Sequence, residues 1–207
     1  MKSCKIWLSG IIISVFLAII AVSCTENESE TYVLPLPRTI MPIEDVITNP
    51  YLLLMFDTLY DGDDPPVLVN EGYVADPYIL TYSSVASDTM LYGETFEPKY
   101  FRFKNQTLDN TLYYEAKQGT EYTSVQAGYI RGSGDNFTVY FEETRTEEDG
   151  TELITQTIMT GTKTSAGIAN LKSAFIIVKG PYVPGTPQNT TSRMFVDGDG
   201  VAVNCNW

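Results

Sequence analysis

The chain has 207 residues, 13 basic and 26 acidic, which gives a net charge of −13, and it contains no histidine. This length suits one domain of ordinary size or two small ones. The absence of histidine excludes Ser-His-Asp and Cys-His triads and zinc centres built on imidazole. The acidic balance argues against a nucleic-acid partner, because phosphate binding needs a positive surface.

The N-terminus has the pattern of a secretory signal. Lys2 and Lys5 precede an apolar run over residues 6–22, which ends in small residues before Cys24. A permanent transmembrane helix is the alternative, because the run is just long enough to span a bilayer. Residues 21–24 resemble a bacterial lipobox, which implies cleavage before Cys24 and a lipid on its thiol. We therefore predict a signal peptide over 1–23 and lipidation of Cys24.

Residues 24–42 are predicted to form a flexible tether between the lipid and a domain over 43–207. The segment is acidic just after Cys24 and then rich in proline, a composition that cannot pack a core. Its acidic run resembles the surface-export signal of lipoproteins from Bacteroides-type bacteria, with an ordinary solvated linker as the alternative. We expect an outer-membrane lipoprotein exposed at the cell surface, which is anchored by the lipid on Cys24 and does not span the membrane.

The body of the chain is predicted to be all β. Phe137, Val139 and Phe141 share one face of the clearest strand, at a period of two residues. Asp149-Gly150 favours a hairpin after it. Helical signals are limited to single turns at 43–47 and 167–172. Other β-rich or apolar segments, read as strands, are 51–56, 67–80, 100–103, 112–116, 122–130, 153–162, 173–178 and 201–207.

The order of segments 136–141, 160–164 and 167–171 resembles lipocalin-like lipoproteins of Bacteroides-type bacteria. The resemblance covers about the last 80 residues and implies a single antiparallel up-and-down barrel that holds a small ligand. The Gly-x-Trp signature of typical lipocalins is missing, because the only tryptophan after the signal segment is Trp207. A two-sheet β-sandwich is the alternative architecture.

Carboxylates are the main candidates for catalysis in a chain without histidine. A glycoside hydrolase needs two of them at a fixed separation. Glu142 and Glu143 are adjacent, but neighbours on a strand point to opposite faces, so they cannot share a cleft without a bulge. Residues 147–149 lie at an expected turn tip. We therefore predict no catalytic site, and a carboxylate hydrolase is the less favoured alternative.

Two acidic turns are weak candidates for a calcium site, through Asp61 and Asp63 and through Asp197 and Asp199. Neither matches the twelve-residue calcium loop, and Asp and Gly are also the commonest turn residues. We expect no metal and no cofactor. Cys205 is predicted to be a small packing residue without an intramolecular partner, because Cys4 leaves with the signal and Cys24 carries lipid.

Tyrosines and threonines supply the remaining candidates. Tyrosines of the expected strands can line an apolar cavity or present rings to a sugar, although tyrosine is also an ordinary strand residue. We name Tyr113, Tyr129 and Tyr140 as candidates, from a group that also includes Tyr114 and Tyr122. Thr58 and Thr89 each follow Asp and precede an apolar residue, a pattern that resembles the O-glycosylation sequon of Bacteroides-type bacteria. Thr58 lying within a strand is the alternative.

These observations predict a non-catalytic binding module, anchored in the envelope by lipid and monomeric, for a small apolar or glycan-like ligand or an envelope protein. The alternative is a structural or adhesive component of fimbrial type, which polymerises by strand donation after cleavage at an arginine. Arg38 lies in the tether, where such cleavage would fall.

Overall fold

A computed structural model describes residues 41–68, 72–146, 149–180 and 191–207. They belong to one compact unit that runs from Arg38 to Trp207. The predicted signal peptide, Cys24 and most of the predicted tether lie outside the described residues. No helix in the described ranges has the length and apolar character that crossing a bilayer requires.

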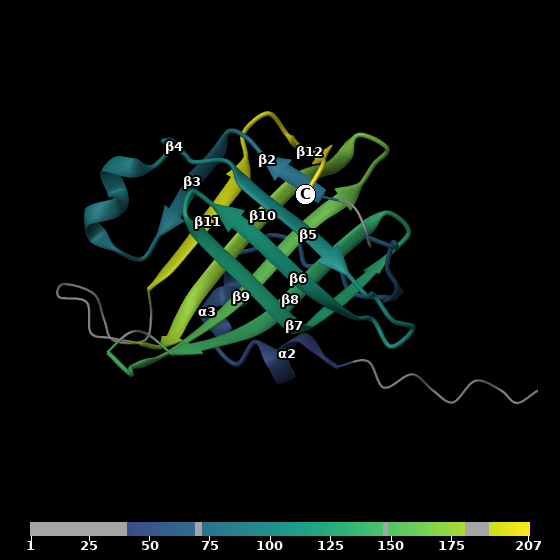
Figure 1. Ribbon diagram of the computed structural model, residues 1–207, viewed down its shortest axis with the longest axis horizontal. Helices are drawn as coiled ribbons and strands as arrows, with labels where there is room; N and C mark the ends of the chain where they lie inside the picture. The colour runs from purple at the N-terminus through teal and green to yellow at the C-terminus, as the bar shows by residue number, and fades with distance from the viewer. Residues whose placement is uncertain (1–40, 69–71, 147–148, 181–190) are drawn as a thin grey trace, which may run out of the picture. The chain divides into compact units, whose positions relative to one another are not determined.

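Eight antiparallel strands close into a barrel, shown in Figure 1. Each strand pairs with the next along the chain, from β2 through β5, β6, β7, β8, β9 and β10, and β12 then pairs with both β10 and β2. The short β1 pairs in parallel with β7. The strands are β1 (Asp63–Asp64), β2 (Gly72–Ala75), β3 (Tyr78–Ser83), β4 (Thr95–Phe96), β5 (Lys99–Lys104), β6 (Thr111–Gln118), β7 (Glu121–Ser133), β8 (Asn136–Thr146), β9 (Glu152–Lys163), β10 (Gly167–Lys179), β11 (Ser192–Asp197) and β12 (Val201–Cys205).

The remaining strands extend the barrel wall at one end. The start of β10 pairs with β12, and its continuation over 172–176 pairs with β11. In turn β11 pairs with β3, and β3 with β4. Three residues separate β11 from β12, and two separate β2 from β3, so each pair is one bent strand of the wall. The end that β3, β4 and β11 extend is the end that holds the candidate site.

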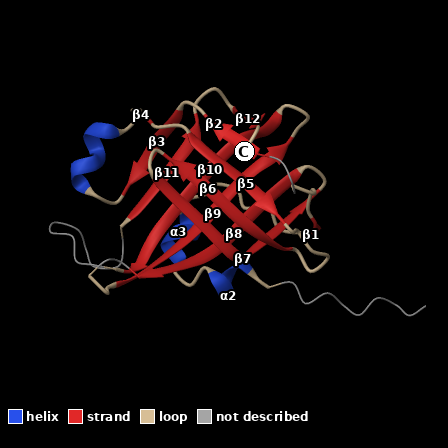
Figure 2. Cartoon of the chain, in the orientation of Figure 1, coloured by secondary structure: helices blue, strands red, loops and turns tan. Residues whose placement is uncertain are grey.

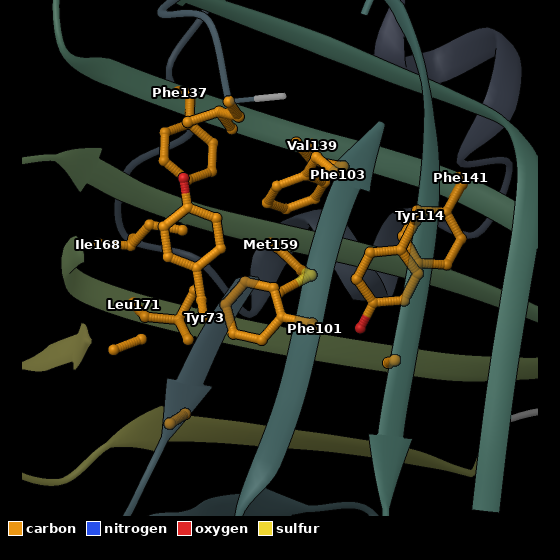
Figure 3. Close-up of a cluster of buried hydrophobic side chains, with 14 of the residues drawn as sticks. Tyr73, Phe101, Phe103, Tyr114, Phe137, Val139, Phe141, Met159, Ile168 and Leu171 are labelled. Carbon is orange, nitrogen blue, oxygen red and sulfur yellow. The ribbon is translucent and has the colours of Figure 1, made fainter. Parts of the chain in front are cut away.

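Strand alternation fills the interior with large apolar side chains. On β8, Phe137, Val139 and Phe141 point inward and are almost completely buried. Figure 3 shows them with Phe101 and Phe103 of β5, stacked between the walls of the barrel. Ring centroids of Phe101 and Phe103 lie 5.8 Å apart in an edge-to-face arrangement, which aromatic pairs favour. This cluster is the main core.

A second apolar cluster lies outside the barrel, beneath helices α2 (Ile43–Val46) and α3 (Pro50–Leu54). The Asn49 side chain caps α3 by accepting from the Tyr51 amide at 3.0 Å, and Pro50 occupies its first turn, where no amide donor is needed. The helices cover the outer faces of β8 to β11. The buried members of the cluster are Ile47, Leu52, Phe56, Tyr140, Ile158, Ala174, Ile176 and Met194.

Gln156 of β9 attaches this helical segment to the barrel. Its side chain is completely buried. The amide nitrogen donates to the Val46 carbonyl at 3.0 Å and to the Thr48 hydroxyl at 2.9 Å, and the amide oxygen accepts from the Asn49 amide at 3.2 Å. A buried amide with these partners fixes the register between segment 46–49 and the barrel wall.

The closed barrel confirms the predicted all-β, lipocalin-like architecture and excludes the two-sheet sandwich. The hairpin at Asp149-Gly150 is also confirmed, since β8 and β9 pair on either side of it and Gly150 has a φ of 83°. Ser173–Val178 lies in β10, with one face inside the barrel and the other beneath the helices, as a strand buried on both faces should.

Two local predictions were wrong. Residues 51–56, read as a strand, begin within helix α3, because Asn49-Pro50 is a helix start and the segment is too short for its apolar run to reveal a period. Residues 167–172, read as a helical turn, belong to β10. Asn170, with a φ of 54°, lies there in a β-bulge between the pairs made by Ala169 and Lys172, and the bulge disturbs the alternation.

One further helix connects β3 to β4 at the extended end of the barrel. This 3-10 helix, η1 (Ala86–Leu91), is drawn in blue at the left of Figure 2. Asp88 of η1 is buried and accepts from the Ser83 hydroxyl at 2.6 Å. Its carboxylate also pairs with Arg193 of β11 at 2.7 Å, so η1 is held against the rim of the barrel.

Candidate functional site

A cavity of about 500 Å³ occupies the end of the barrel beside β3, β4 and β11. This volume lies within the range of small-molecule sites in proteins, and the mouth of a β-barrel is one of their usual places. All the long strands from β5 to β11 contribute lining side chains. The cavity is therefore formed by the barrel wall itself.

Aromatic rings form the inner part of the cavity. Tyr78 and Phe195 stack with centroids 4.6 Å apart and planes 7° apart, and Phe96 meets Phe195 edge-on at 5.4 Å. Tyr114 and Phe141 stack at 4.7 Å. Because these rings pack against one another, they form a rigid apolar surface that a ligand can contact.

Short hydroxyl side chains leave the space open. Thr155 and Thr157 of β9 and Ser173 of β10 line the cavity where the other half of the barrel has large residues. The Tyr78 hydroxyl forms a hydrogen bond with Ser173, which only partly offsets the burial that raises the pKa of Tyr78 to about 12. Tyr78 therefore stays neutral. The walls offer hydrogen-bonding groups above an apolar base.

Charged side chains line the outer part of the cavity. Burial lowers the pKa of Lys99, and the charges of Glu143 and Glu121 oppose that effect. Burial raises the pKa of Glu143, and Arg145 and Lys99 oppose it. These opposite shifts show that charges of both signs share a poorly solvated space. A ligand with polar groups at one end can replace the missing water there.

Another hollow of about 570 Å³ lies at the opposite end of the barrel. It is bounded by turns, with Gly134 and Asp135 between β7 and β8 and Thr164 and Ser165 between β9 and β10. No buried apolar side chain lines it, so it offers little surface to exclude water. The aromatic cavity is the better candidate.

The three tyrosines named from the sequence lie on the outer wall. Tyr113 points outward from β6, between the inward-facing Leu112 and Tyr114. Tyr129 and Tyr140 stack at 5.7 Å beside the outer cluster, and the Tyr140 hydroxyl donates to the Met41 carbonyl. The structure therefore brings two of the three together, but none of them lines the cavity.

Two other tyrosines, Tyr78 and Tyr114, do line the cavity. Tyr114 belonged to the group of strand tyrosines considered from the sequence but was not selected, and Tyr78 was missed. A signal for Tyr114 was present. Leu112, Tyr114 and Ala116 alternate along β6 with the spacing of an inward face, and all three are buried. No comparable signal marked Tyr78, because β3 is short and its register is set by the distant β11.

The adjacent carboxylates Glu142 and Glu143 point to opposite sides of β8, as strand alternation predicts. Glu143 lines the cavity. Glu142 lies on the outer wall and accepts from the Gln156 amide at 2.9 Å. The structure therefore does not bring them into one cleft.

The four candidate calcium ligands lie in two separate segments, one at the start of β1 and one at the end of β11. Arg131 contacts Asp61 at 2.7 Å and Asp63 at 2.9 Å, so both carboxylates already share a guanidinium partner. Burial and the neighbouring Asp199 raise the pKa of Asp197 to about 6, and each of these two carboxylates accepts from a backbone amide of its own turn. The described residues include no group of three or more side chains suited to hold a metal ion.

Thr58 and Thr89, the candidate glycosylation sites, are both exposed. Thr58 follows α3 in a loop and is not part of a strand. Thr89 lies on η1, where its hydroxyl donates to the Ala86 carbonyl at 3.0 Å. Cys205 is free and half-buried at the end of β12, and burial raises the pKa of its thiol. Cys24 and Arg38 lie outside the described residues.

Comparisons of the chain with family models, with curated proteins and with solved structures found no match.

Proposed function

We propose that this protein is a lipid-anchored binding protein of the bacterial envelope, which holds a small apolar or glycan-like ligand in its barrel without catalysis. The observation that carries the proposal is the cavity of about 500 Å³, with aromatic rings at its base, hydroxyl groups on its walls and charges at its mouth. That gradient suits a ligand with an apolar or ring-shaped body and a polar end.

The anchoring part of the proposal is supported by the sequence alone. The lipobox at residues 21–24 supplies a thiol for acylation, and the acidic, proline-rich segment after it supplies a spacer. Cells fed an alkyne-labelled fatty acid should label the natural chain and leave a Cys24→Ala variant unlabelled. Equal labelling of both would exclude Cys24 as the lipid site.

Native mass spectrometry tests whether the cavity holds a ligand. The chain from Thr25 to Trp207 contains the whole compact unit 38–207, whose strands pair only with one another around their own core, and it should fold alone. Purified gently, it should carry extra mass that disappears on denaturation. A bare monomer would contradict a tightly held ligand, and a ladder of oligomers would support the structural, fimbrial-type alternative.

A matched pair of variants connects any bound ligand to the cavity. Thr155→Trp fills the space from β9, whereas Thr144→Trp places the same side chain on the exposed outer side of β8. We expect Thr155→Trp to lose the extra mass, and to lower the affinity for an added apolar fluorescent probe by at least about tenfold, or about 1.4 kcal/mol. Thr144→Trp should retain both. Equal binding by the two variants would move the site elsewhere.

A further inference from the structure

The outer surface of the barrel differs between its two walls. The outer faces of β8 to β11 are covered by α2 and α3. The opposite wall, which carries β5 and β6, lies nearest the viewer in Figure 1, and in the described part of the chain no helix packs on it. Its outward-facing side chains are therefore available to contact another surface.

A row of side chains crosses this uncovered wall. Register pairs join Val203 of β12 to Val74 of β2, Val74 to Tyr100 of β5, Tyr100 to Lys117 of β6, and Lys117 to Tyr122 of β7. Tyr100 is 42% exposed and Tyr122 is 56% exposed. The row is thus apolar and aromatic with one central cation.

Three cations gather on this wall around one carboxylate. Arg102 and Lys104 of β5 both contact Glu115 of β6, at 2.6 Å and 2.8 Å. Lys117 lies 4.3 Å and Arg102 4.5 Å from the centroid of the Trp207 ring. Glu115 is the one carboxylate among the outward-facing residues of β5 and β6, both of which are described in full.

Most other cations of the described chain have carboxylates of their own. Arg131 has two, and Lys172 and Lys179 have one each. The uncovered wall is therefore a place where positive charge exceeds negative charge, in a chain with a net charge of −13. We call it the β5/β6 face, made up of Val74, Tyr100, Arg102, Lys104, Tyr113, Glu115, Lys117, Tyr122, Val203 and Trp207.

We propose that the β5/β6 face lies on the surface of an anionic lipid bilayer. Tyrosine and tryptophan favour the interface between headgroups and hydrocarbon, and lysine and arginine are attracted to anionic headgroups. The outward positions of β5 and β6 hold no Asn, Asp or Gln, the side chains that suit hydrogen bonding to sugar hydroxyls, so a polysaccharide fits less well. The proposal depends on neither the cavity nor the lipid on Cys24.

The acidic character of the whole chain does not prevent this contact at physiological salt. Charges are screened beyond about 8 Å at that ionic strength. The opposite wall of the barrel is about 10 Å away or more, the usual spacing of facing sheets. The bilayer therefore experiences mainly the near charges. In this orientation the cavity opens to the side, along the membrane surface.

Vesicle binding tests the proposal with the chain from Thr25 to Trp207. Its only tryptophan is Trp207, because Trp7 precedes Thr25, so indole emission reports on the β5/β6 face itself. The face carries three cations against Glu115 and the terminal carboxylate of Trp207. One net positive charge should favour equimolar phosphatidylcholine and phosphatidylglycerol vesicles over phosphatidylcholine alone by about fivefold. The emission should shift to the blue on contact, and ~1 M salt should weaken binding.

Two double variants with equal changes in total charge separate the face from the whole molecule. Lys104→Gln with Lys117→Gln removes two of the three cations of the β5/β6 face and should lower binding to the anionic vesicles by about 30-fold. Lys172→Gln with Lys179→Gln removes two cations from β10 on the opposite wall and should leave binding unchanged. Tyr122→Ser should weaken binding several-fold, whereas Tyr82→Ser on β3, where the tyrosine is 45% exposed, should not.

Several outcomes would overturn the proposal. They are no binding to anionic vesicles, equal binding to neutral ones, or equal losses from the two double variants. Binding to a soluble anionic polysaccharide such as polygalacturonate, without binding to vesicles, would also overturn it and assign the face to a glycan. Circular dichroism on each variant checks that the barrel is still folded.

Discussion

The two halves of the barrel interior share strands β5 to β10 but differ in the side chains that these strands point inward. Toward the β7–β8 and β9–β10 turns, Phe103, Phe137 and Ile168 are wholly buried in the main core and do not line the cavity. Toward the other end, the same β8 and β9 present Glu143 and Thr155 to a cavity. The same strands pair along both halves, and the volume and polarity of their inward side chains differ between this open half and the first, solid half.

The largest expected effect is in the solid half. Phe103 contacts the rings of Tyr73, Phe101, Tyr114 and Phe137, so Phe103→Ala should lower the free energy of unfolding by about 3–5 kcal/mol. Thr157→Ala in the open half removes little buried surface and should cost less than about 1 kcal/mol. Chemical denaturation of both variants measures the contrast. Similar losses would mean that the two halves are equally packed.

A smaller effect concerns the charges of the open half. Lys99 lowers the pKa of Glu143 from across the cavity, so Lys99→Met should raise that pKa further. The direction follows because loss of a nearby positive charge destabilises the ionised carboxylate. Lys104→Met, on the outer wall, should have no such effect. A carboxyl NMR titration of Glu143 distinguishes them, and no difference would place Lys99 outside electrostatic reach.

The smallest effect is a dependence of stability on pH. The pKa of Glu143 is raised by folding, so the native state holds its proton more tightly than the unfolded chain. The associated stability is present below the unfolded pKa and is lost as pH rises through the folded pKa. Relative to Glu143→Gln, the natural chain should lose ~1–2 °C in melting temperature over that interval.

Melting curves between pH 4 and 7 give the comparison, at pH values that span the ordinary pKa of glutamate. A gain in relative stability with rising pH would mean that Glu143 is stabilised in its charged form. The side chains of the solid half do not gain or lose protons between pH 4 and 7, so they do not contribute to the pH dependence of the melting temperature.

The sequence was sufficient for the fold class because the chain satisfies strand alternation nearly everywhere. Phe137, Val139 and Phe141 marked the inner face of β8, and Asp149-Gly150 marked the hairpin that follows. The sequence was not sufficient to assign secondary structure where a short segment was compatible with both a strand and a helix. The apolar residues 51–56 are equally suited to a strand and to a helix, and only packing on the outer wall decides between them.

The site was harder to predict, because a closed barrel of this kind buries both faces of some strands. Tyr140 lies out of phase with Phe137 and Phe141, so alternation alone excludes it from the interior. Tyr140 is buried because α2 and α3 cover it, and no sequence pattern near Tyr140 predicts that these helices pack there. The cavity forms because the pairing register of β9 and β10 brings Thr155, Thr157 and Ser173 to the same part of the wall. That register cannot be predicted from one sequence.

Barrel closure has a consequence for how the chain acquires its structure. The first strand of the ring, β2, pairs with β12, the last, and Asn49 bonds Gln156 at a separation of 107 residues. Contacts between such distant residues slow folding, because a long loop must close before they form. A chain that emerges N-terminus first therefore holds the apolar residues of α3 exposed until its final strands arrive. Folding should be a slow, single event after the whole chain is released, and truncation of β12 should prevent it.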